Sequence, residues 1–77
     1  MLNTIKKIIS DEIEIAPSEI KDYHTIEELG IDSLAWTEII LELEKEFNIT
    51  ISLDDTFDIN KFNFSDLCRL TKATIDA

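Results

Sequence analysis

The sequence predicts an all-α fold, with three substantial helices, one short helix and a long loop between the first two helices. The chain has 1 Gly and 1 Pro among its 77 residues, so it holds little material for the turns that a β-fold needs. Apolar residues make up 44% of the chain, enough for a core, and they recur at helical spacing in three separate segments. A chain of this length is expected to form one domain, over residues 1–77.

The first helix is expected over residues 3 to 14. Four isoleucines fall close to one face at helical spacing, namely Ile5, Ile8, Ile9 and Ile13. Asn3 is suited to cap the start of this helix. Pro17 prevents its continuation, because the residue before a proline avoids helical backbone geometry.

Residues 15 to 31 are expected to form a long connection that packs onto the helices. Its apolar side chains are spaced irregularly, which indicates anchors rather than a helix face: Ile15, Ile20, Tyr23, Ile26 and Leu29. Gly30 ends the segment at a point where we expect a positive φ, which glycine adopts without steric cost.

Residues 33 to 47 show the clearest helical pattern. An apolar stripe typical of a core-facing helix consists of Trp36, Ile39, Ile40, Leu43 and Phe47. The charged side chains expected to face outward are Glu38, Glu42, Lys45 and Glu46. A second, narrower apolar line consists of Leu34, Thr37 and Leu41.

The segment after this helix alternates like a strand over residues 48 to 53, but the sequence holds no second strand for it to pair with. We therefore expect an extended linker, with Ile49 and Ile51 turned inward and a strand content close to nil.

Two further helices are expected after this linker. A short helix is expected at 54 to 59, with Asp54 and Asp55 at its start and Phe57 turned inward. The last helix is expected over 64 to 75, with Asn63 as N-cap and Asp66 three residues later, near the positive end of the helix dipole. Its buried side is expected to include Phe64, Leu67, Leu70 and either Cys68 or Ile75.

The charge of the chain narrows the classes of partner. Asp and Glu number 17 against 7 Lys and Arg, for a formal net charge of −10 at pH 7. Such a surface repels nucleic-acid phosphates and anionic membrane lipid, and it suits a partner protein with a basic docking patch. By itself, this acidity is equally consistent with a role in solubility alone.

The chain lacks residues that several classes of function require. Cys68 is the only cysteine, so no internal disulfide forms, and no apolar run reaches the length of a signal sequence or membrane span. Together these favour a reducing cytoplasm. His24 is the only histidine, which leaves a metal site or a nucleophilic serine without partners. Because the chain is too small for a roomy catalytic cavity, we expect a carrier or binding protein rather than an enzyme.

Residues 28 to 34, with the sequence ELGIDSL, join the long loop to the second helix. Ser33 is expected at the cap or first position of that helix, where free backbone N–H groups and the helix dipole favour an anion. A phosphodiester on Ser33 would therefore lie in a favourable field. Serine and aspartate are also ordinary N-caps, so these residues alone leave open a helical interaction module without any attached group.

The motif LGIDSL resembles the Leu-Gly-x-Asp-Ser-Leu attachment motif of the acyl carrier protein family. The resemblance extends over nearly the whole chain: IKKII at 5 to 9 is similar to the first helix of a carrier, residues 38 to 47 to its acidic second helix, and SDL at 65 to 67 to the start of its last helix. This resemblance implies a four-helix bundle of acyl-carrier type. We expect a monomer, because a shuttle needs its docking face free.

The resemblance also implies roles for single residues. Ser33 would hold a 4'-phosphopantetheine arm, transferred from coenzyme A by a phosphopantetheinyl transferase, and the arm would carry an acyl group as a thioester. Asp32 would aid recognition during that transfer. The side chains that would dock on acyl-transferring, ligase or synthase enzymes with basic patches are Leu34, Glu38, Leu41 and Glu42. The pathway implied is fatty-acid, polyketide or related synthesis.

Four differences from the family pattern leave the cargo open. Ala35 stands where many fatty-acid carriers have an acid, and Trp36 replaces a smaller residue that faces the space between helices. The stretch from residue 47 to 62 is longer than usual, and Thr25 stands where a Phe is frequent. The run Asp-Ser-Leu-Ala also resembles the D-alanyl carriers, so an aminoacyl or peptidyl carrier remains the alternative.

Overall fold

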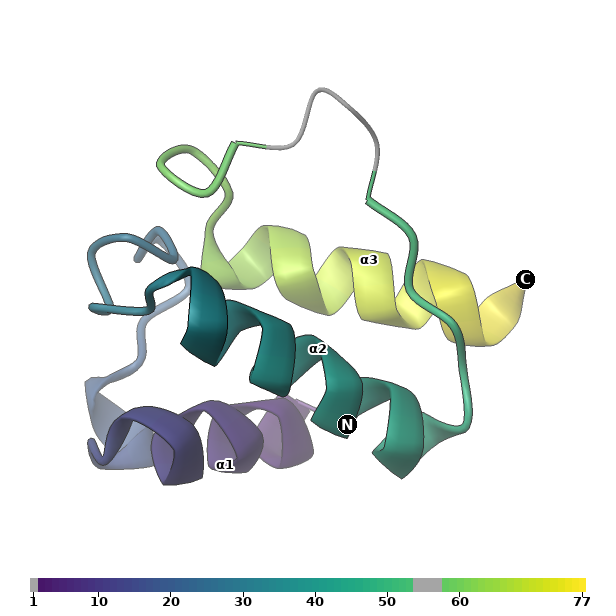
Figure 1. The fold of residues 1–77 in the computed structure, drawn as a ribbon, viewed down its shortest axis with the longest axis horizontal. Helices are drawn as coiled ribbons and strands as arrows, with labels where there is room; N and C mark the ends of the chain where they lie inside the picture. Colours follow the sequence, from purple (N-terminus) through teal and green to yellow (C-terminus); the bar gives the residue numbers. More distant parts are fainter. Residues whose placement is uncertain (1, 54–57) are drawn as a thin grey trace.

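The computed structural model describes residues 2–53 and 58–77. These residues form three α-helices, α1 (Leu2–Ile13), α2 (Ser33–Phe47) and α3 (Phe64–Asp76), and one 3-10 turn, η1 (Pro17–Glu19). In Figure 1, α1 runs in the opposite direction to α2, whereas α3 runs in the same direction as α2. The long loop therefore lies at the end of the molecule where α1 stops and where α2 and α3 begin.

The described residues confirm an all-α fold. The three long helices are present, and the bounds of α2 are those that the sequence predicts. Apart from one isolated bridge between Thr25 and Asn63, the described parts of the chain contain no strand. The short helix expected at 54 to 59 falls largely outside the described residues, as do Asp54, Asp55 and Phe57. Of its described positions, 58 has no regular structure and 59 belongs to a turn over residues 59 to 61. A fourth helix therefore stays a prediction.

One core joins all three helices to the loops. Its buried apolar residues are Ile5, Ile9, Ile20, Ile26, Ile31, Trp36, Ile39, Leu43, Ile51, Phe64 and Leu67. Most of them lie in the predicted helical stripes or among the predicted loop anchors. The half-buried members of those sets pack around this core: Ile8, Ile13, Ile15, Leu29, Ile40, Phe47, Ile49, Cys68 and Leu70.

The core differs from the prediction at three positions. Thr71 is completely buried, and its hydroxyl donates a hydrogen bond of 2.8 Å to the Leu67 carbonyl. Because the hydroxyl is satisfied by its own helix, burial leaves no unpaired polar group. Ile75, expected inward as the alternative to Cys68, is 40% exposed, and Tyr23, expected to anchor the loop, is 71% exposed.

The first helix agrees with the prediction at its end and differs from it at its start. The helix begins at Leu2, so Asn3 lies inside the helix and the expectation that it is the N-cap is wrong. The helix ends at Ile13, before Pro17 as predicted, and Glu14 takes a left-handed conformation with φ 59°. Left-handed residues commonly end helices in this way.

The segment after α2 is extended and pinned by one glutamate. Asn48 ends the helix with φ 53°, and the carboxylate of Glu44 accepts a hydrogen bond of 2.9 Å from the backbone N–H of Ile51. Ile51 is buried, which confirms the prediction of an extended linker with this residue turned inward.

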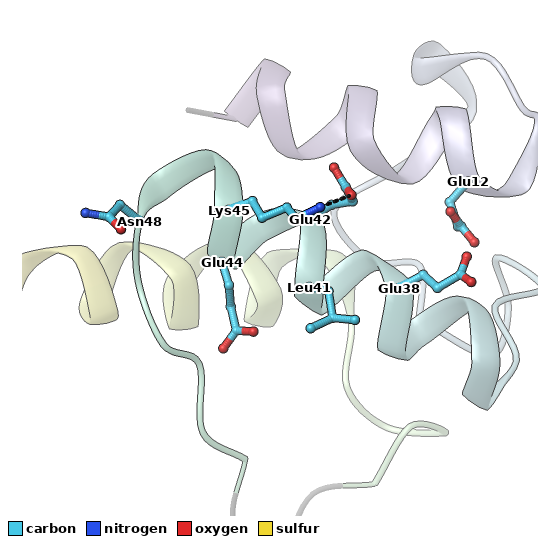
Figure 2. A pocket seen from close by; sticks show the side chains of 7 residues that line it. All are labelled: Glu12, Glu38, Leu41, Glu42, Glu44, Lys45 and Asn48. Carbon is cyan, nitrogen blue, oxygen red and sulfur yellow. Dashed lines mark ion pairs between the residues drawn. The ribbon is translucent and has the colours of Figure 1, made fainter.

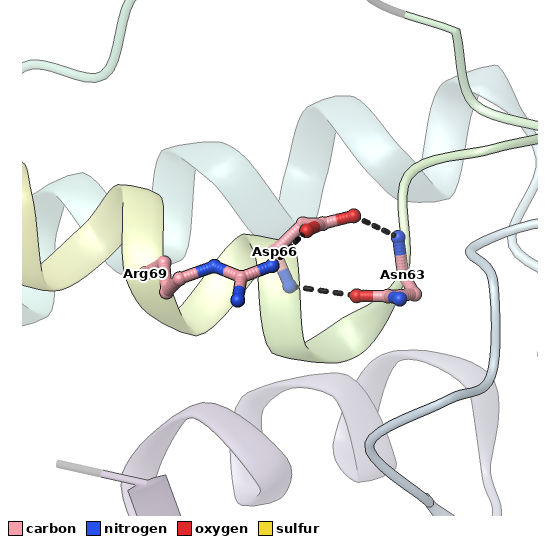
Figure 3. Close-up of polar contacts among 3 residues, drawn as sticks. All are labelled: Asn63, Asp66 and Arg69. Atoms are coloured by element: carbon pink, nitrogen blue, oxygen red, sulfur yellow. Dashed lines mark hydrogen bonds and ion pairs between the residues drawn. The ribbon is translucent and has the colours of Figure 1, made fainter.

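A capping box opens α3. The Asn63 side chain accepts a hydrogen bond of 2.7 Å from the Asp66 N–H, and the Asp66 carboxylate accepts one of 3.0 Å from the Asn63 N–H. Figure 3 shows both bonds, together with the contact of Arg69 with the Asp66 carboxylate. Two N–H groups that lack intrahelical partners are satisfied in this way, and the predicted cap is confirmed.

Candidate functional site

A hydrogen-bonded turn over residues 25 to 31 leads the chain into α2. Thr25 and Glu28 open this turn with reciprocal bonds, in which the Glu28 carboxylate accepts from the Thr25 N–H at 2.8 Å. The Thr25 hydroxyl oxygen accepts from the Glu28 N–H at 3.0 Å. Hydrogen bonds with Thr25 hold the pKa of the Glu28 carboxyl below its usual value.

The same turn ends in a Schellman arrangement around Gly30. The N–H of Ile31 bonds to the Ile26 carbonyl at 3.2 Å, and the N–H of Gly30 bonds to the Glu27 carbonyl at 2.9 Å. Gly30 has φ 80°, the positive value that the sequence predicts and that this motif requires. Because Ile26 and Ile31 are both buried, the turn is held to the core and delivers residue 32 to the start of α2.

Backbone hydrogen bonds tie this loop to the start of α3. The N–H of Ile26 bonds to the Phe62 carbonyl at 2.9 Å, and the N–H of Phe64 bonds to the His24 carbonyl at 2.9 Å. The N–H of Ser65 bonds to the Asp22 carbonyl at 3.1 Å. The loop that precedes Ser33 is therefore fixed from both sides, by the core and by α3.

Asp32 caps α2, and Ser33 is its first residue. Asp32 has an extended backbone, and its carboxylate accepts a hydrogen bond of 2.8 Å from the Ala35 N–H. Ser33 is exposed. Within the described residues no acceptor takes the N–H groups of Ser33 or Leu34, so the positive end of α2 faces solvent beside the Ser33 hydroxyl.

The predicted docking residues lie on one exposed face of α2. They are Leu34, Glu38, Leu41 and Glu42, which are separated by four, three and one positions. Leu34 is 70% exposed and Leu41 is 52% exposed, and Glu38 and Glu42 are exposed between and beside them. Lys45 is the only basic residue of α2, and its Nζ lies 3.8 Å from Oε1 of Glu42. The structure thus places Leu34, Glu38, Leu41 and Glu42 on one exposed face of α2, the helix that begins at Ser33.

A groove of about 480 Å³ lies along this face, between α1 and α2 (Figure 2). It is lined by Glu12, Glu38, Leu41, Glu42, Glu44, Lys45 and Asn48. Glu12 comes from α1 and its carboxylate points toward that of Glu38. The pKa of Glu12 is raised, mainly by a side-chain hydrogen bond with Glu38. Sequence reasoning missed Glu12, because nothing in its own helix marks it as a neighbour of α2.

Trp36 lies inside the core, directly behind this surface. It is 7% exposed, and its ring meets the Phe62 ring edge-on, with centroids 5.8 Å apart and an interplanar angle of 72°. Such edge-to-face pairs are favourable for aromatic rings. Phe62 lies just before α3, so this pair fills space between α2 and the approach to α3.

The single histidine and the single cysteine of the chain lie in different surroundings. His24 sits in the loop, where its Nδ1 accepts a hydrogen bond of 3.1 Å from the Lys21 N–H. Burial raises the pKa of the Cys68 thiol, which keeps it in the unreactive protonated form. Among the described residues, no three His, Cys, Asp or Glu side chains are grouped to hold a metal ion. The described helices also include none that is long and apolar enough to cross a membrane.

The sequence of the chain is similar to the sequences of known proteins. Residues 3–70 match the family described as "Phosphopantetheine attachment site". The acyl carrier protein of Nitratidesulfovibrio vulgaris (strain DP4) is 41% identical over 58 residues, which cover 74% of this chain and 76% of that protein. Acyl carrier proteins of Chlamydia trachomatis serovar L2 and Buchnera aphidicola are each 44% identical, over 52 and 57 residues, covering 66% and 73% of this chain and 68% and 71% of theirs.

The family match reaches from α1 into α3 and so includes the entire segment around the start of α2. Phosphopantetheine is the cofactor of this family, and its members carry acyl groups rather than catalyse reactions. The chain belongs to the acyl carrier protein family, and it is a phosphopantetheine-bearing carrier, not an enzyme.

Proposed function

We propose that Ser33 is the residue that carries the 4'-phosphopantetheine arm, and that the arm holds an acyl intermediate as a thioester. The observation that carries this proposal is the exposed Ser33 at the first position of α2, capped by Asp32. The N–H groups at the start of α2 would hold the phosphodiester through the helix dipole. The thioester supplies an activated carbonyl, and the arm delivers it to the active sites of other enzymes.

The exposed face of α2 is proposed as the docking surface for those enzymes. Leu34 and Leu41 would be covered by apolar side chains of the partner, while Glu38 and Glu42 would meet basic side chains. Charge complementarity of this kind raises the rate of encounter and permits quick release, which suits a carrier that visits several enzymes. Asp32 adds one more carboxylate next to the attachment point.

The partners proposed are a phosphopantetheinyl transferase and acyl-transferring, ligase or synthase enzymes of fatty-acid, polyketide or related synthesis. We propose that residues 1–77 form one carrier domain. We propose that it acts in the cytoplasm and as a monomer, since a shuttle needs its docking face free. An aminoacyl or peptidyl cargo is the alternative, supported by the residues Asp32 to Ala35. A ketosynthase among the neighbouring genes would support the acyl cargo, and an adenylating ligase the aminoacyl one.

The cargo is proposed to be short, or to stay outside the core. The Trp36–Phe62 pair fills part of the interior, and close-packed interiors leave few voids for an added chain. A short acyl group then gains nothing from burial. The test compares the melting temperatures of carriers loaded with acyl chains of increasing length; a clear rise with chain length would contradict this proposal.

The attachment itself is tested by mass spectrometry. The protein is incubated with coenzyme A and a broad-specificity phosphopantetheinyl transferase, and the intact mass is measured before and after. We expect the mass of one phosphopantetheine group to be added to the wild type and not to Ser33→Ala. No gain on the wild type, or an equal gain on the variant, would refute Ser33 as the attachment point.

A further inference from the structure

A second groove lies on another side of α1, away from α2. It has a volume of about 480 Å³ and is formed by α1, η1 and the loop that follows η1, with the lining residues Lys6, Ser18, Ile20, Lys21, Asp22 and Tyr23. Glu12 lines the groove beside α2, and Lys6 lies about 120° from it around the axis of α1. We call this second site the lysine groove.

Both ammonium groups of the lysine groove are held in place by groups that leave their charge unpaired. The Lys6 ammonium lies 5.8 Å from the centroid of the Phe64 ring, a favourable cation–π distance. The Lys21 ammonium donates a hydrogen bond of 2.9 Å to the Ser18 carbonyl. Within residues 2–53 and 58–77, the ion pairs lie on α2 and α3 and include neither lysine. Because an ammonium group has three N–H donors, each lysine has donors left for an anionic ligand.

Tyr23 supplies an exposed aromatic ring beside these charges. It is 71% exposed, and its ring meets the His24 ring edge-on, with centroids 4.8 Å apart. The backbone on one side of it is fixed by a bond of 3.1 Å from the Ser65 N–H to the Asp22 carbonyl. On the other side the Phe64 N–H bonds to the His24 carbonyl at 2.9 Å. Tyrosines dominate many protein interfaces, and a ring on a fixed backbone loses little freedom when a partner covers it.

The charge around the lysine groove differs from that of α2. Four glutamates and one lysine lie on α2, whereas α1 and α3 each have two acidic and two basic residues. The lysine groove has two lysines and one carboxylate, that of Asp22, in a chain with a net charge of −10. A negatively charged ligand therefore complements this groove, while a basic partner is directed to α2.

The shape of the groove favours a narrow ligand. A membrane of anionic lipid is broad, and it would meet the acidic side chains of α2 and the long loop as well as the lysines. A free phosphate ion would contact the ammonium groups and leave the Tyr23 ring uncovered. A peptide segment with carboxylates and an aromatic side chain matches both features, because its acids bond to the lysines and its ring packs on Tyr23.

We propose that the lysine groove binds an acidic segment of a partner enzyme, with an aromatic side chain among its carboxylates. No residue of the groove belongs to α2, so the bound carrier keeps Ser33 and the exposed face of α2 uncovered. One enzyme can then hold the carrier by this groove while another docks on α2. This consequence rests on the proposed function, whereas the binding itself does not.

The test is an NMR titration of the full-length, isotope-labelled protein at low salt, with the acetylated peptide EDEFEDE as the probe. The variants are Lys6→Gln, Lys21→Gln and Tyr23→Ala, and the matched controls are Lys7→Gln and Leu34→Ala. Lys7 is exposed on the same helix as Lys6 and does not line the groove. Leu34 is 70% exposed, about as much as Tyr23, and lies on α2. Circular dichroism melts establish that each variant is folded.

We expect the backbone signals of residue 6 and residues 18 to 23 to shift most. Lys6→Gln and Lys21→Gln should each raise the Kd of the peptide about two- to fivefold, as for the loss of one exposed ion pair. Tyr23→Ala should raise it by about fivefold or more, as for an aromatic residue central to an interface. Lys7→Gln and Leu34→Ala should change it less than about twofold, because neither side chain touches the peptide.

No binding of the peptide, shifts mainly outside the groove, equal effects of Lys6→Gln and Lys7→Gln, or no effect of Tyr23→Ala would each overturn the inference. Equal shifts with inorganic phosphate at the same concentration would reveal a simple anion site instead. Binding to phosphatidylglycerol vesicles but not to the peptide would reveal a membrane contact instead, and either result also overturns the inference. The phosphopantetheine mass gain on Ser33 is measured separately, so a failure of the groove leaves the proposed function standing.

Discussion

Replacing Gly30 by alanine isolates the backbone strain in the turn that positions Ser33. Gly30 has φ 80°, and a Cβ built at this position meets no atom within 4 Å. The substitution therefore introduces no clash, and its cost is conformational. A left-handed backbone costs an L-residue about 1–2 kcal/mol, while the lower entropy of the unfolded chain returns about 0.4–1 kcal/mol. We expect a net loss of about 1 kcal/mol in the free energy of unfolding.

The assay is urea and thermal unfolding followed by circular dichroism, with Gly30→Asn as the matched control. A loss of about 1 kcal/mol lowers the melting temperature of a domain of this size by about 4–8 °C. Asparagine tolerates the left-handed region better than alanine, so Gly30→Asn should lie between the wild type and Gly30→Ala. Unchanged stability of Gly30→Ala, or an asparagine variant less stable than the alanine one, would refute the reasoning.

Other substitutions test the cap, the core and the acid response. Asn63→Ala removes the acceptor for the Asp66 N–H and should cost about 1 kcal/mol in urea unfolding; no change would mean that the cap does not stabilise α3. Leu43→Ala, at a completely buried position, should cost about 2–5 kcal/mol, whereas Leu41→Ala on the exposed face should leave stability nearly unchanged and weaken transfer by the transferase; equal losses of stability would contradict the assigned faces. The pKa of Asp66 is lowered from its ordinary 3.8, mainly by the Asn63 N–H, so its stabilising effect is present above that pH and is lost as the pH falls through the folded-state value. Asp66→Asn should flatten this acid-side decline in melting temperature, and an unchanged decline would assign it to other carboxyls.

Glu12 makes a contribution of opposite sign to the dependence of folding stability on acidic pH. The pKa of Glu12 is raised, mainly by the hydrogen bond with Glu38, so in the folded state this group holds its proton to a higher pH than in the unfolded chain. Its contribution favours folding below the ordinary pKa of 4.5 and is lost as the pH rises through the folded-state value. Glu12 thus partly offsets the loss from Asp66 on acidification.

The local elements of this protein follow from short stretches of sequence. The bounds of α2, the Asn63 cap of α3 and the positive φ of Gly30 are all as the sequence predicts. Each depends on hydrogen bonds or steric limits among residues a few positions apart, so a short segment holds the needed information. The position of Ser33 as the first residue of α2 belongs to this class.

The tertiary structure decided which helix faces meet. In the tertiary structure, Glu12 of α1 lines a groove together with residues of α2, Thr71 is buried and Ile75 is exposed. Burial depends on where a helix lies against its neighbours, and periodicity gives only the relative positions of residues around one helix. The sequence by itself therefore determined the family motif, the helices and the start of α2. Only the packing of α1 against α2 created the groove, because Glu12 and Glu38, which line it from the two helices, are 26 positions apart in the chain and share no local pattern.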